Sequence, residues 1–488
     1  MEHQRKLFQQ RGYSEDLLPK TQSQRTWKTF NYFTLWMGSV HNVPNYVMVG
    51  GFFILGLSTF SIMLAIILSA FFIAAVMVLN GAAGSKYGVP FAMILRASYG
   101  VRGALFPGLL RGGIAAIMWF GLQCYAGSLA CLILIGKIWP GFLTLGGDFT
   151  LLGLSLPGLI TFLLFWLVNV GIGFGGGKVL NKFTAILNPC IYIVFGGMAI
   201  WAISLVGIGP IFDYIPSGIQ KAENSGFLFL VVINAVVAVW AAPAVSASDF
   251  TQNAHSFREQ ALGQTLGQTL GLVVAYILFA VAGVCIIAGA SIHYGADTWN
   301  VLDIVQRWDS LFASFFAVLV ILMTTISTNA TGNIIPAGYQ IAAIAPTKLT
   351  YKNGVLIASI ISLLICPWKL MENQDSIYLF LDIIGGMLGP VIGVMMAHYF
   401  VVMRGQINLD ELYTAPGDYK YYDNGFNLTA FSVTLVAVIL SLGGKFIPFM
   451  EPLSRVSWFV GVIVAFAAYA LLKKRTTAEK TGEQKTIG

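Results

Sequence analysis

The feature that most constrains the fold of this chain is a series of twelve apolar runs, each about 20 residues long. They occupy residues 31–56, 58–83, 105–136, 155–175, 181–206, 226–248, 265–289, 311–343, 354–370, 377–402, 426–447 and 456–473. A helix of that length spans a lipid bilayer, and charged residues make up only 10% of the chain, against about 25% in soluble domains. We therefore expect an all-α integral membrane protein with 12 transmembrane helices.

The Lys and Arg residues are distributed unevenly between the two sides of this predicted bundle. With the N-terminus inside, the inner segments hold 22 of the 28 Lys and Arg residues. The outer segments hold Lys137, Lys221, Arg307, Lys369, Lys445 and Arg455. This bias predicts a multi-pass plasma-membrane protein with both termini in the cytoplasm. The net charge of +7 then reflects topology, and we expect no nucleic-acid partner.

Two of the apolar runs are interrupted by polar residues and proline. The first contains His41, Asn42, Pro44 and Asn45, and the sixth is broken near Pro243, five runs later. Interruptions at matching places are typical of inverted-repeat transporters, whose binding site lies at the membrane midplane beside both breaks. The alternative is that these prolines only kink their helices.

The repeat interpretation predicts a division of the chain into six parts. These are a cytoplasmic arm (1–30), two inverted five-helix repeats (31–206 and 226–402), a cytoplasmic loop (403–425), helices 11 and 12 (426–473) and a cytoplasmic tail (474–488).

Aromatic and amide side chains suggest the walls of a binding site. Trp119 and Gln123 are four residues apart in the third run, so they share one helix face. A flat indole beside an amide that both donates and accepts hydrogen bonds suits a planar polar ligand, and Trp240 at the second break offers a second ring. The alternative is that Trp119 packs on lipid while Gln123 joins neighbouring helices.

The eighth run contains the densest polar stretch at membrane depth, from Thr324 to Asn333. The hydroxyls of Ser327 and Thr328, together with carbonyls freed at the first break, would form an all-oxygen site for a hard cation such as Na⁺. Asn333, farther along the helix, is placed to reach the substrate. Alternatively, several of these hydroxyls bond back to the preceding helical turn and bind nothing.

The scarcity of charged side chains at membrane depth restricts the choice of substrate. We find no Lys or Arg near the centre of a span, and interpret Asp249 and Asp382 as helix-end or interfacial groups. This favours a neutral, amide-rich substrate and sodium rather than proton coupling. The stretch Gly171–Gly176 fits a dinucleotide-binding spacing but follows a membrane span, so we expect a cytoplasmic loop there and no cofactor. The sequence does not indicate that this chain is an enzyme.

Motifs across nearly the whole chain resemble the first nucleobase:cation symporter family. They are Leu17-Leu18-Pro19, residues 31–45, Trp119 with Gln123, Trp240 with Ser248-Asp249-Phe250, the run from Ser327 to Asn333, and Tyr421 through Asn427. The chain looks most like the bacterial allantoin permeases, relatives of the hydantoin transporters. The resemblance implies a five-plus-five inverted-repeat fold with discontinuous helices 1 and 6, two additional C-terminal helices and alternating access.

The resemblance also assigns site residues. It implies that substrate contacts Trp119, Gln123, Trp240, Asn333 and Asn42, and that Na⁺ is bound by the carbonyls of Gly38, His41 and Thr324 with the hydroxyls of Ser327 and Thr328. His41 and Thr324 stand where the family has apolar residues, and Asn42 stands where the hydantoin carriers have Gln. The His41 side chain has no assigned role.

These observations together predict a secondary active importer of allantoin, a neutral ureide ring of purine metabolism, by cation symport with Na⁺ and as a functional monomer. Two alternatives remain at this point. One is the same fold carrying hydantoin, uracil or cytosine with H⁺ coupling, and the other is a facilitative channel.

Overall fold

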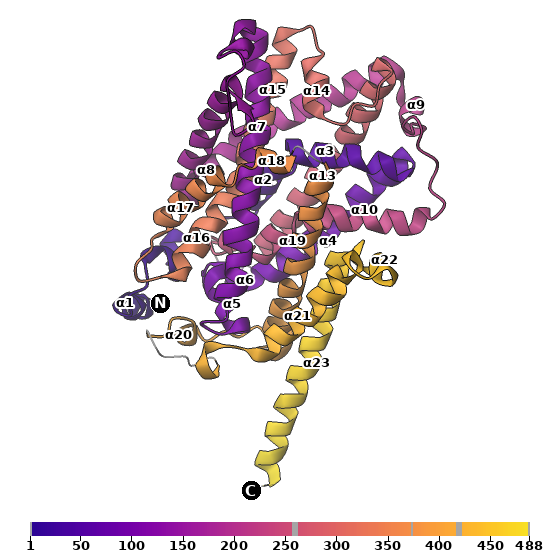
Figure 1. Cartoon of the computed structure of the whole chain (residues 1–488). Helices are drawn as coiled ribbons and strands as arrows, with labels where there is room; N and C mark the ends of the chain where they lie inside the picture. Colours follow the sequence, from indigo (N-terminus) through magenta and orange to yellow (C-terminus); the bar gives the residue numbers. More distant parts are fainter. Residues whose placement is uncertain (1, 256–261, 372–373, 416–421, 487–488) are drawn as a thin grey trace.

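The computed structural model of this chain describes residues 2–255, 262–371, 374–415 and 422–486. Arg258, Lys420 and Tyr421, used in the charge distribution and in the motifs above, lie outside these residues. The fold is almost entirely helical, with one short antiparallel hairpin in which Thr150 pairs with Ser155. Figure 1 shows a bundle of long helices, with α23 extending beyond it at the C-terminal end.

The helices before residue 213 are the following. They are α1 (Glu2–Gln10), α2 (Thr29–Val40), α3 (Val43–Phe52), α4 (Thr59–Tyr87), α5 (Phe91–Tyr99), α6 (Leu105–Gly108), the π-helical turn η4 (Leu109–Ala115), α7 (Ala116–Ile138), α8 (Leu156–Val206) and α9 (Ile208–Phe212). The strands β1 (Thr150–Leu151) and β2 (Leu154–Ser155) form the hairpin between α7 and α8.

The remaining helices follow from residue 225. They are α10 (Ser225–Val239), α11 (Ala241–Val245), α12 (Ser248–Thr251), α13 (Gln264–Tyr294), α14 (Val301–Gln306), α15 (Leu311–Asn329), the π-helical turn η7 (Ala330–Ile334), α16 (Ile335–Ile344), α17 (Tyr351–Leu364), α18 (Trp368–Met371), α19 (Gln374–Met396), the π-helical turn η8 (Ala397–Val402), α20 (Leu409–Leu412), α21 (Leu428–Leu442), α22 (Glu451–Ser454) and α23 (Ser457–Thr486).

Each of the twelve predicted apolar runs contains an apolar helix. Within the described residues, eight helices are long and apolar enough to cross a membrane, and a bent pair, Pro448–Ser454 with Ser457–Lys473, makes a ninth. The other three runs contain the shorter apolar helices Val43–Leu55, Ser225–Val239 and Tyr351–Leu364. The prediction of a multi-pass helical membrane fold is therefore confirmed, whereas the division into two inverted repeats stays a prediction.

Both predicted breaks are present. Helix α2 ends at Val40 and α3 begins at Val43, with the intervening Asn42 in an extended conformation. The Asn42 side chain caps α3 by accepting from the Asn45 N–H, and Pro44 occupies the first turn, where no helical N–H bond is needed. In the sixth run, α10 ends at Val239, just before Trp240, and two short helices, α11 and α12, replace the rest of the span.

One predicted loop is wrong. The glycine-rich stretch from Gly171 to Gly176 is helical, and the fourth and fifth spans meet within α8 at a kink where Gly176 has a φ of 58°. A positive φ costs glycine little, so the chain changes direction there without leaving the helical conformation for more than one residue.

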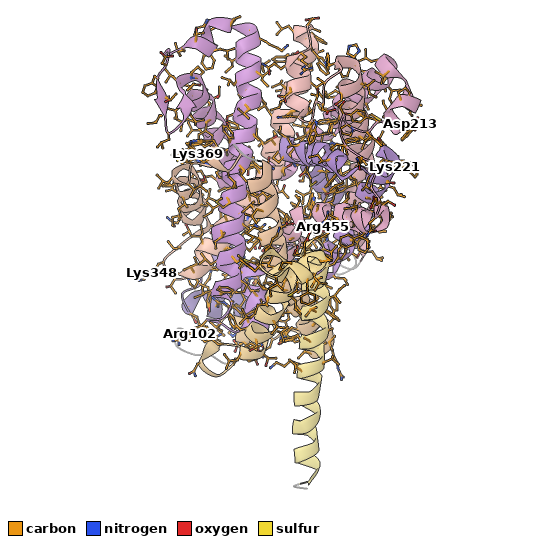
Figure 2. All side chains as sticks on the ribbon, turned by 45° about the vertical axis from the view of Figure 1, so that its right-hand side comes forward. Arg102, Asp213, Lys221, Lys348, Lys369 and Arg455 are labelled. Atoms are coloured by element: carbon orange, nitrogen blue, oxygen red, sulfur yellow. The ribbon has the colours of Figure 1, made fainter. Side chains whose placement is uncertain are left out.

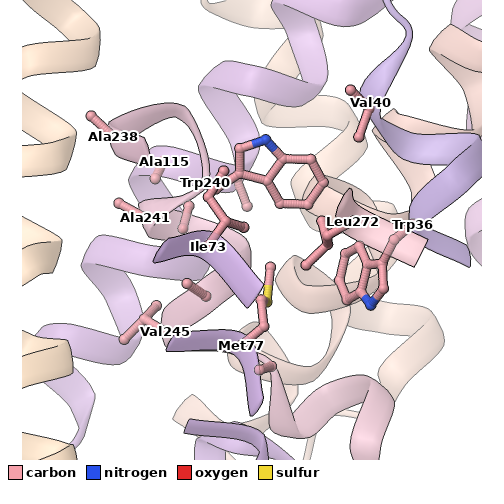
Figure 3. Packing of buried hydrophobic residues seen from close by; sticks show 14 of the residues in the cluster. Trp36, Val40, Ile73, Met77, Ala115, Ala238, Trp240, Ala241, Val245 and Leu272 are labelled. Carbon is pink, nitrogen blue, oxygen red and sulfur yellow. The ribbon is translucent and has the colours of Figure 1, made fainter. Parts of the chain in front are cut away.

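Close helix packing places the first break in the middle of the bundle. Helix α13 packs against α2, α4 and α8. Its Gly267 and Gly271, four residues apart, face the backbone of α2, and a Cβ on Gly271 would lie 2.8 Å from the Phe33 carbonyl oxygen. Small residues at this spacing allow two membrane helices to approach closely. Figure 3 shows the resulting core, in which Trp36 of α2 and Trp240 lie near each other, with ring centroids 5.5 Å apart.

The two ends of the bundle differ in the residues they carry. The N-terminus, α1 and α20 lie at the same end as the C-terminal part of α23, and α9 and α14 lie at the other end (Figure 1). Arg102 and Lys348, both predicted to be cytoplasmic, lie toward the end that holds the N-terminus, whereas Lys221 lies toward the opposite end (Figure 2). This arrangement agrees with the predicted separation of the two sets, and the cytoplasmic location of the termini stays a prediction.

Candidate functional site

A pocket lies between the two breaks, and the space in it that no atom fills, including the part open to solvent, is about 460 Å³. All five residues predicted to contact substrate line it. The lining residues are Ser39, Asn42, Asn45, Trp119, Gln123, Val239, Trp240, Ala242, Pro243, Thr328, Thr331, Gly332 and Asn333. Residues from the first, third, sixth and eighth spans therefore converge on one space, as a midplane site in a broken-helix transporter requires.

Aromatic rings form part of the pocket wall. Trp119 is 7% exposed and its ring contacts Phe380 of α19 edge-on, with centroids 5.8 Å apart. Trp240 is 4% exposed and meets Trp36 and Tyr276 edge-on. Each indole is thus held by neighbouring rings, which limits its rotation and favours a planar ligand.

Amide groups supply the polar part of the pocket. The Gln123 Nε2 donates to the Asn42 Oδ1 at 3.3 Å, and its Oε1 is buried and accepts no hydrogen bond within the described structure. The Asn333 Nδ2 donates to the Asn329 Oδ1 at 2.8 Å, which fixes the orientation of the Asn333 amide. A buried amide oxygen without a donor is unfavourable, so the Gln123 Oε1 is available to accept a further hydrogen bond, and its contact with substrate stays a prediction.

Asn42 has a more central position than the sequence indicates. Besides accepting from Gln123 and from the Asn45 N–H, its side chain donates to the Thr328 hydroxyl at 3.4 Å and to the Val40 carbonyl at 3.3 Å. All of these partners belong to the protein. Asn42 therefore lines the pocket mainly as a bridge between Gln123 and Thr328.

The five residues predicted to bind Na⁺ lie at the junction of α2 and α15. The Thr328 hydroxyl is 2.9 Å from the carbonyl oxygens of both Ser39 and Thr324. The Ser327 hydroxyl is buried without a hydrogen-bond partner, and a Cβ on Gly38 would lie 3.0 Å from it. An orphaned hydroxyl facing the end of a broken helix, where carbonyls are freed, fits a site for a hard cation. The ligand roles themselves stay predictions.

The structure places the His41 side chain, which the sequence leaves unassigned. It is not among the residues that line the pocket and is fully buried, with Nδ1 3.0 Å from the Tyr46 hydroxyl. Its ring stacks on Phe195 at 4.9 Å and meets Phe279 edge-on at 5.9 Å. His41 thus ties the first break to α8 and α13 through packing.

One charged residue was placed incorrectly from the sequence. Arg111, counted above with the cytoplasmic residues, is fully buried in η4 within the long helical segment Leu105–Ile138. It donates from Nε to the Ser246 hydroxyl at 3.0 Å and from Nη2 to the Gly332 carbonyl at 2.6 Å. Arg111 lies near the start of this segment, so it is a buried charge inside a span although not at its centre.

The two acids differ in their surroundings. Asp249, expected to be interfacial, is 2% exposed and accepts from the Phe91 N–H at 2.9 Å, at the first turn of α5. It is a helix-end group, as predicted, but a buried one. Asp382 is partly exposed and pairs with Lys445 at 2.6 Å.

A family model described as "Permease for cytosine/purines, uracil, thiamine, allantoin" matches residues 19–461. The chain belongs to this family. Two relatives extend the match over nearly the whole length. A protein of Escherichia coli (strain K12), provisionally assigned as an allantoin permease, is 99% identical over 100% of both chains. The allantoin permease of Bacillus subtilis (strain 168) is 38% identical, covering 94% of this chain and 93% of its own.

The permease fold is also found in a solved structure. Mhp1, a nucleobase-cation-symport-1 family transporter in a closed conformation with bromovinylhydantoin bound, superposes with a TM-score of 0.76 at 24% identity, covering 96% of each chain. The family model and the two relatives confirm the resemblance to this symporter family, and the Mhp1 structure confirms the fold. This permease is a multi-pass membrane transporter of a small molecule and not an enzyme.

Proposed function

We propose that this permease is a secondary active importer of allantoin that couples uptake to Na⁺ by alternating access. The substrate assignment is supported by the relatives named as allantoin permeases and by the pocket. Allantoin is a small neutral ring rich in N–H and C=O groups. The pocket offers two indoles, the unpaired Gln123 acceptor and the fixed Asn333 amide, and among its lining residues there is no charged side chain.

Sodium coupling is supported by the buried Ser327 hydroxyl that faces Gly38. In the proposed site the carbonyls of Gly38, His41 and Thr324 and the hydroxyls of Ser327 and Thr328 bind the ion. Moving one Na⁺ down a potential of roughly 100 mV provides about 2.3 kcal/mol, which corresponds to nearly fiftyfold accumulation of a neutral substrate.

The observation that carries the proposal is the Asn42 bridge. One side chain contacts both Gln123, which faces substrate, and Thr328, which faces the proposed ion site. Binding at either site changes the energy of the same hydrogen-bond network, so each ligand is expected to tighten the other by an equal factor.

Uptake by proteoliposomes of the purified full chain tests the proposal. Radiolabelled allantoin is expected to accumulate above its external concentration when Na⁺ is outside, and to equilibrate only when choline replaces Na⁺. Accumulation that persists in choline and follows a pH gradient would establish proton coupling instead. Unsaturable uptake without accumulation would establish a channel, and a competition panel of hydantoin, uracil and cytosine identifies the preferred ring.

A pair of hydroxyl variants tests the ion site. Ser327→Ala removes one proposed ligand, and the Na⁺ concentration for half-maximal uptake is expected to rise by about tenfold or more, because bonds to charged groups are the strong ones. Thr325→Ala is the matched control, since the Thr325 hydroxyl bonds only to the Ile321 carbonyl of its own helix. An equal Na⁺ requirement in wild type and Ser327→Ala would contradict the assignment.

A further inference from the structure

We propose that Arg111 is a gate residue: it closes the floor of the central pocket, and its bond to Ser246 opens when substrate leaves toward the end of the bundle that holds the termini. The proposal rests on the central pocket being the site of the transported molecule, as proposed above. It depends on neither the identity of the substrate nor the coupling ion.

The contacts of Arg111 join three spans next to the pocket. Arg111 belongs to the third span, Ser246 follows α11 in the sixth, and Gly332 belongs to η7 in the eighth. Gly332 and its neighbour Asn333 both line the pocket. The guanidinium therefore holds the backbone that carries two pocket residues and connects it to the broken helix.

The position of Arg111 along the third span determines on which side of the pocket the proposed gate lies. Arg111 precedes Trp119 by eight residues, about 12 Å along a helix axis. Arg102, nine residues before Arg111, lies toward the end that holds the N-terminus in Figure 2. A molecule that leaves the pocket toward that end must pass the plane of Arg111, and the bridge from the third to the sixth span must open.

The charges around Arg111 are arranged for an exchange of partners. A buried guanidinium in a membrane protein is costly unless it is balanced, and Asp249 is the acid that interacts with it electrostatically. The two do not form an ion pair within 4 Å. Arg111 Nη1 and Asp249 Oδ2 are both buried and have no hydrogen-bond partner in the described structure. Each therefore retains an unused bond that the other can satisfy.

The spacing of Ser246 and Asp249 is compatible with an exchange of Arg111 from one of them to the other. They are three residues apart in consecutive turns, and the Asp249 N–H donates to the Ser246 carbonyl at 2.9 Å. A shift of the sixth span by about one turn past the third would transfer Arg111 from the Ser246 hydroxyl to the Asp249 carboxylate. Discrete one-turn shifts of this kind occur between packed elements with two stable arrangements.

The test measures access to the pocket floor from each side. Val239 lines the pocket and touches neither Arg111 nor Ser246 through a hydrogen bond, so Val239→Cys, in a chain whose five native cysteines are replaced, serves as the reporter. A membrane-impermeant maleimide is applied to one face at a time in vesicles whose orientation is determined by protease digestion of the C-terminal tail. Neither substrate nor Na⁺ is present.

Removal of the bond between Arg111 and Ser246 is expected to change the labelling rate from one face of the membrane only. Ser246→Ala should increase the labelling rate from the face that holds the termini by about tenfold, and leave the rate from the opposite face unchanged or lower. Arg111→Lys keeps the charge but cannot bond Ser246 and Gly332 as a planar fork, so it should have the same one-sided effect. Where Arg111→Lys does not fold, Ser246→Ala decides.

A matched control distinguishes gating from general loosening. Ser248→Ala removes a buried hydroxyl two residues further on, which bonds to the Asn80 carbonyl and not to the third span. It is expected to leave both labelling rates at the values of the reporter alone. Unchanged rates in Ser246→Ala, or an equal increase from both faces, would overturn the proposal without affecting the uptake results.

Discussion

The substitution Asn42→Ser separates the bridge from the helix cap at the first break. The Asn42 Oδ1 caps α3 by accepting from the Asn45 N–H, and Ser is as good a capping residue as Asn. The shorter Ser side chain cannot reach Gln123 or Thr328. The variant therefore keeps the cap and removes the bridge between the two sites.

The size of the effect follows from the two bonds that are lost. The contacts to Gln123 and Thr328 are long, at 3.3 and 3.4 Å, so each is assigned the lower half of the usual net value, about 0.5–1 kcal/mol. Their joint loss is about 1–2 kcal/mol, equivalent to a reduction in coupling of roughly 5- to 30-fold. Unfolding stability should fall by a comparable amount, and Asn42→Ala, which also lacks the cap, should lose about 1 kcal/mol more.

Equilibrium titrations measure both quantities. Allantoin affinity is determined by isothermal calorimetry on the purified protein at zero and saturating Na⁺, and the ratio of the two dissociation constants is the coupling factor. This factor is expected to approach 1 in Asn42→Ser, and thermal unfolding should show that Asn42→Ser keeps its fold and is more stable than Asn42→Ala, which also lacks the cap. If the variant keeps the wild-type factor while its fold is intact, the coupling does not pass through Asn42.

Two further predictions concern the pocket and the outer end of the bundle. Trp119→Ala and Asn333→Ala should each weaken allantoin binding at least about tenfold in the same titrations, because they remove a ring wall and an oriented amide. Trp139→Ala, which changes an exposed Trp at the far end of the same span, should bind normally, and tight binding by either pocket variant would refute the assignment. Lys445→Ala breaks a pair whose side chains are each about one-third exposed, so thermal unfolding should show a loss below about 1 kcal/mol. A larger loss would mean that Asp382 is shielded from solvent.

The sequence predicts well those features that depend on local chemistry. Apolar length identifies the spans, and Pro44 and Pro243 mark the two breaks because proline cannot take part in the helical hydrogen-bond ladder. The helical spacing of Trp119 and Gln123 correctly places both on the pocket side. Each of these signals lies within a few residues of the feature it predicts.

The remaining features depend on partners that are distant in sequence. Arg111 lies near the start of an apolar run, and only the approach of Ser246 and Gly332 shows that it is buried rather than cytoplasmic. Asn42 is recognisable as a polar residue at a break, but its role as a bridge requires Gln123 and Thr328 to be brought to it. The Gly171–Gly176 stretch is predicted to be a loop because it follows a membrane span, but packing between membrane helices tolerates glycine within a helix, and the stretch belongs to α8.

The π-helical turn η4 has a consequence for insertions and deletions. The gate residue Arg111 lies within this turn and the pocket residue Trp119 follows it, and a π turn holds one residue more than the α-helical turn it replaces. Deleting a single residue there, such as Ile114, would change neither the length nor the apolar character of the span noticeably. It would, however, rotate everything on one side of the deletion by about 100° relative to the other. One extra residue therefore determines how Arg111 and Trp119 are oriented relative to each other around the axis of this helix.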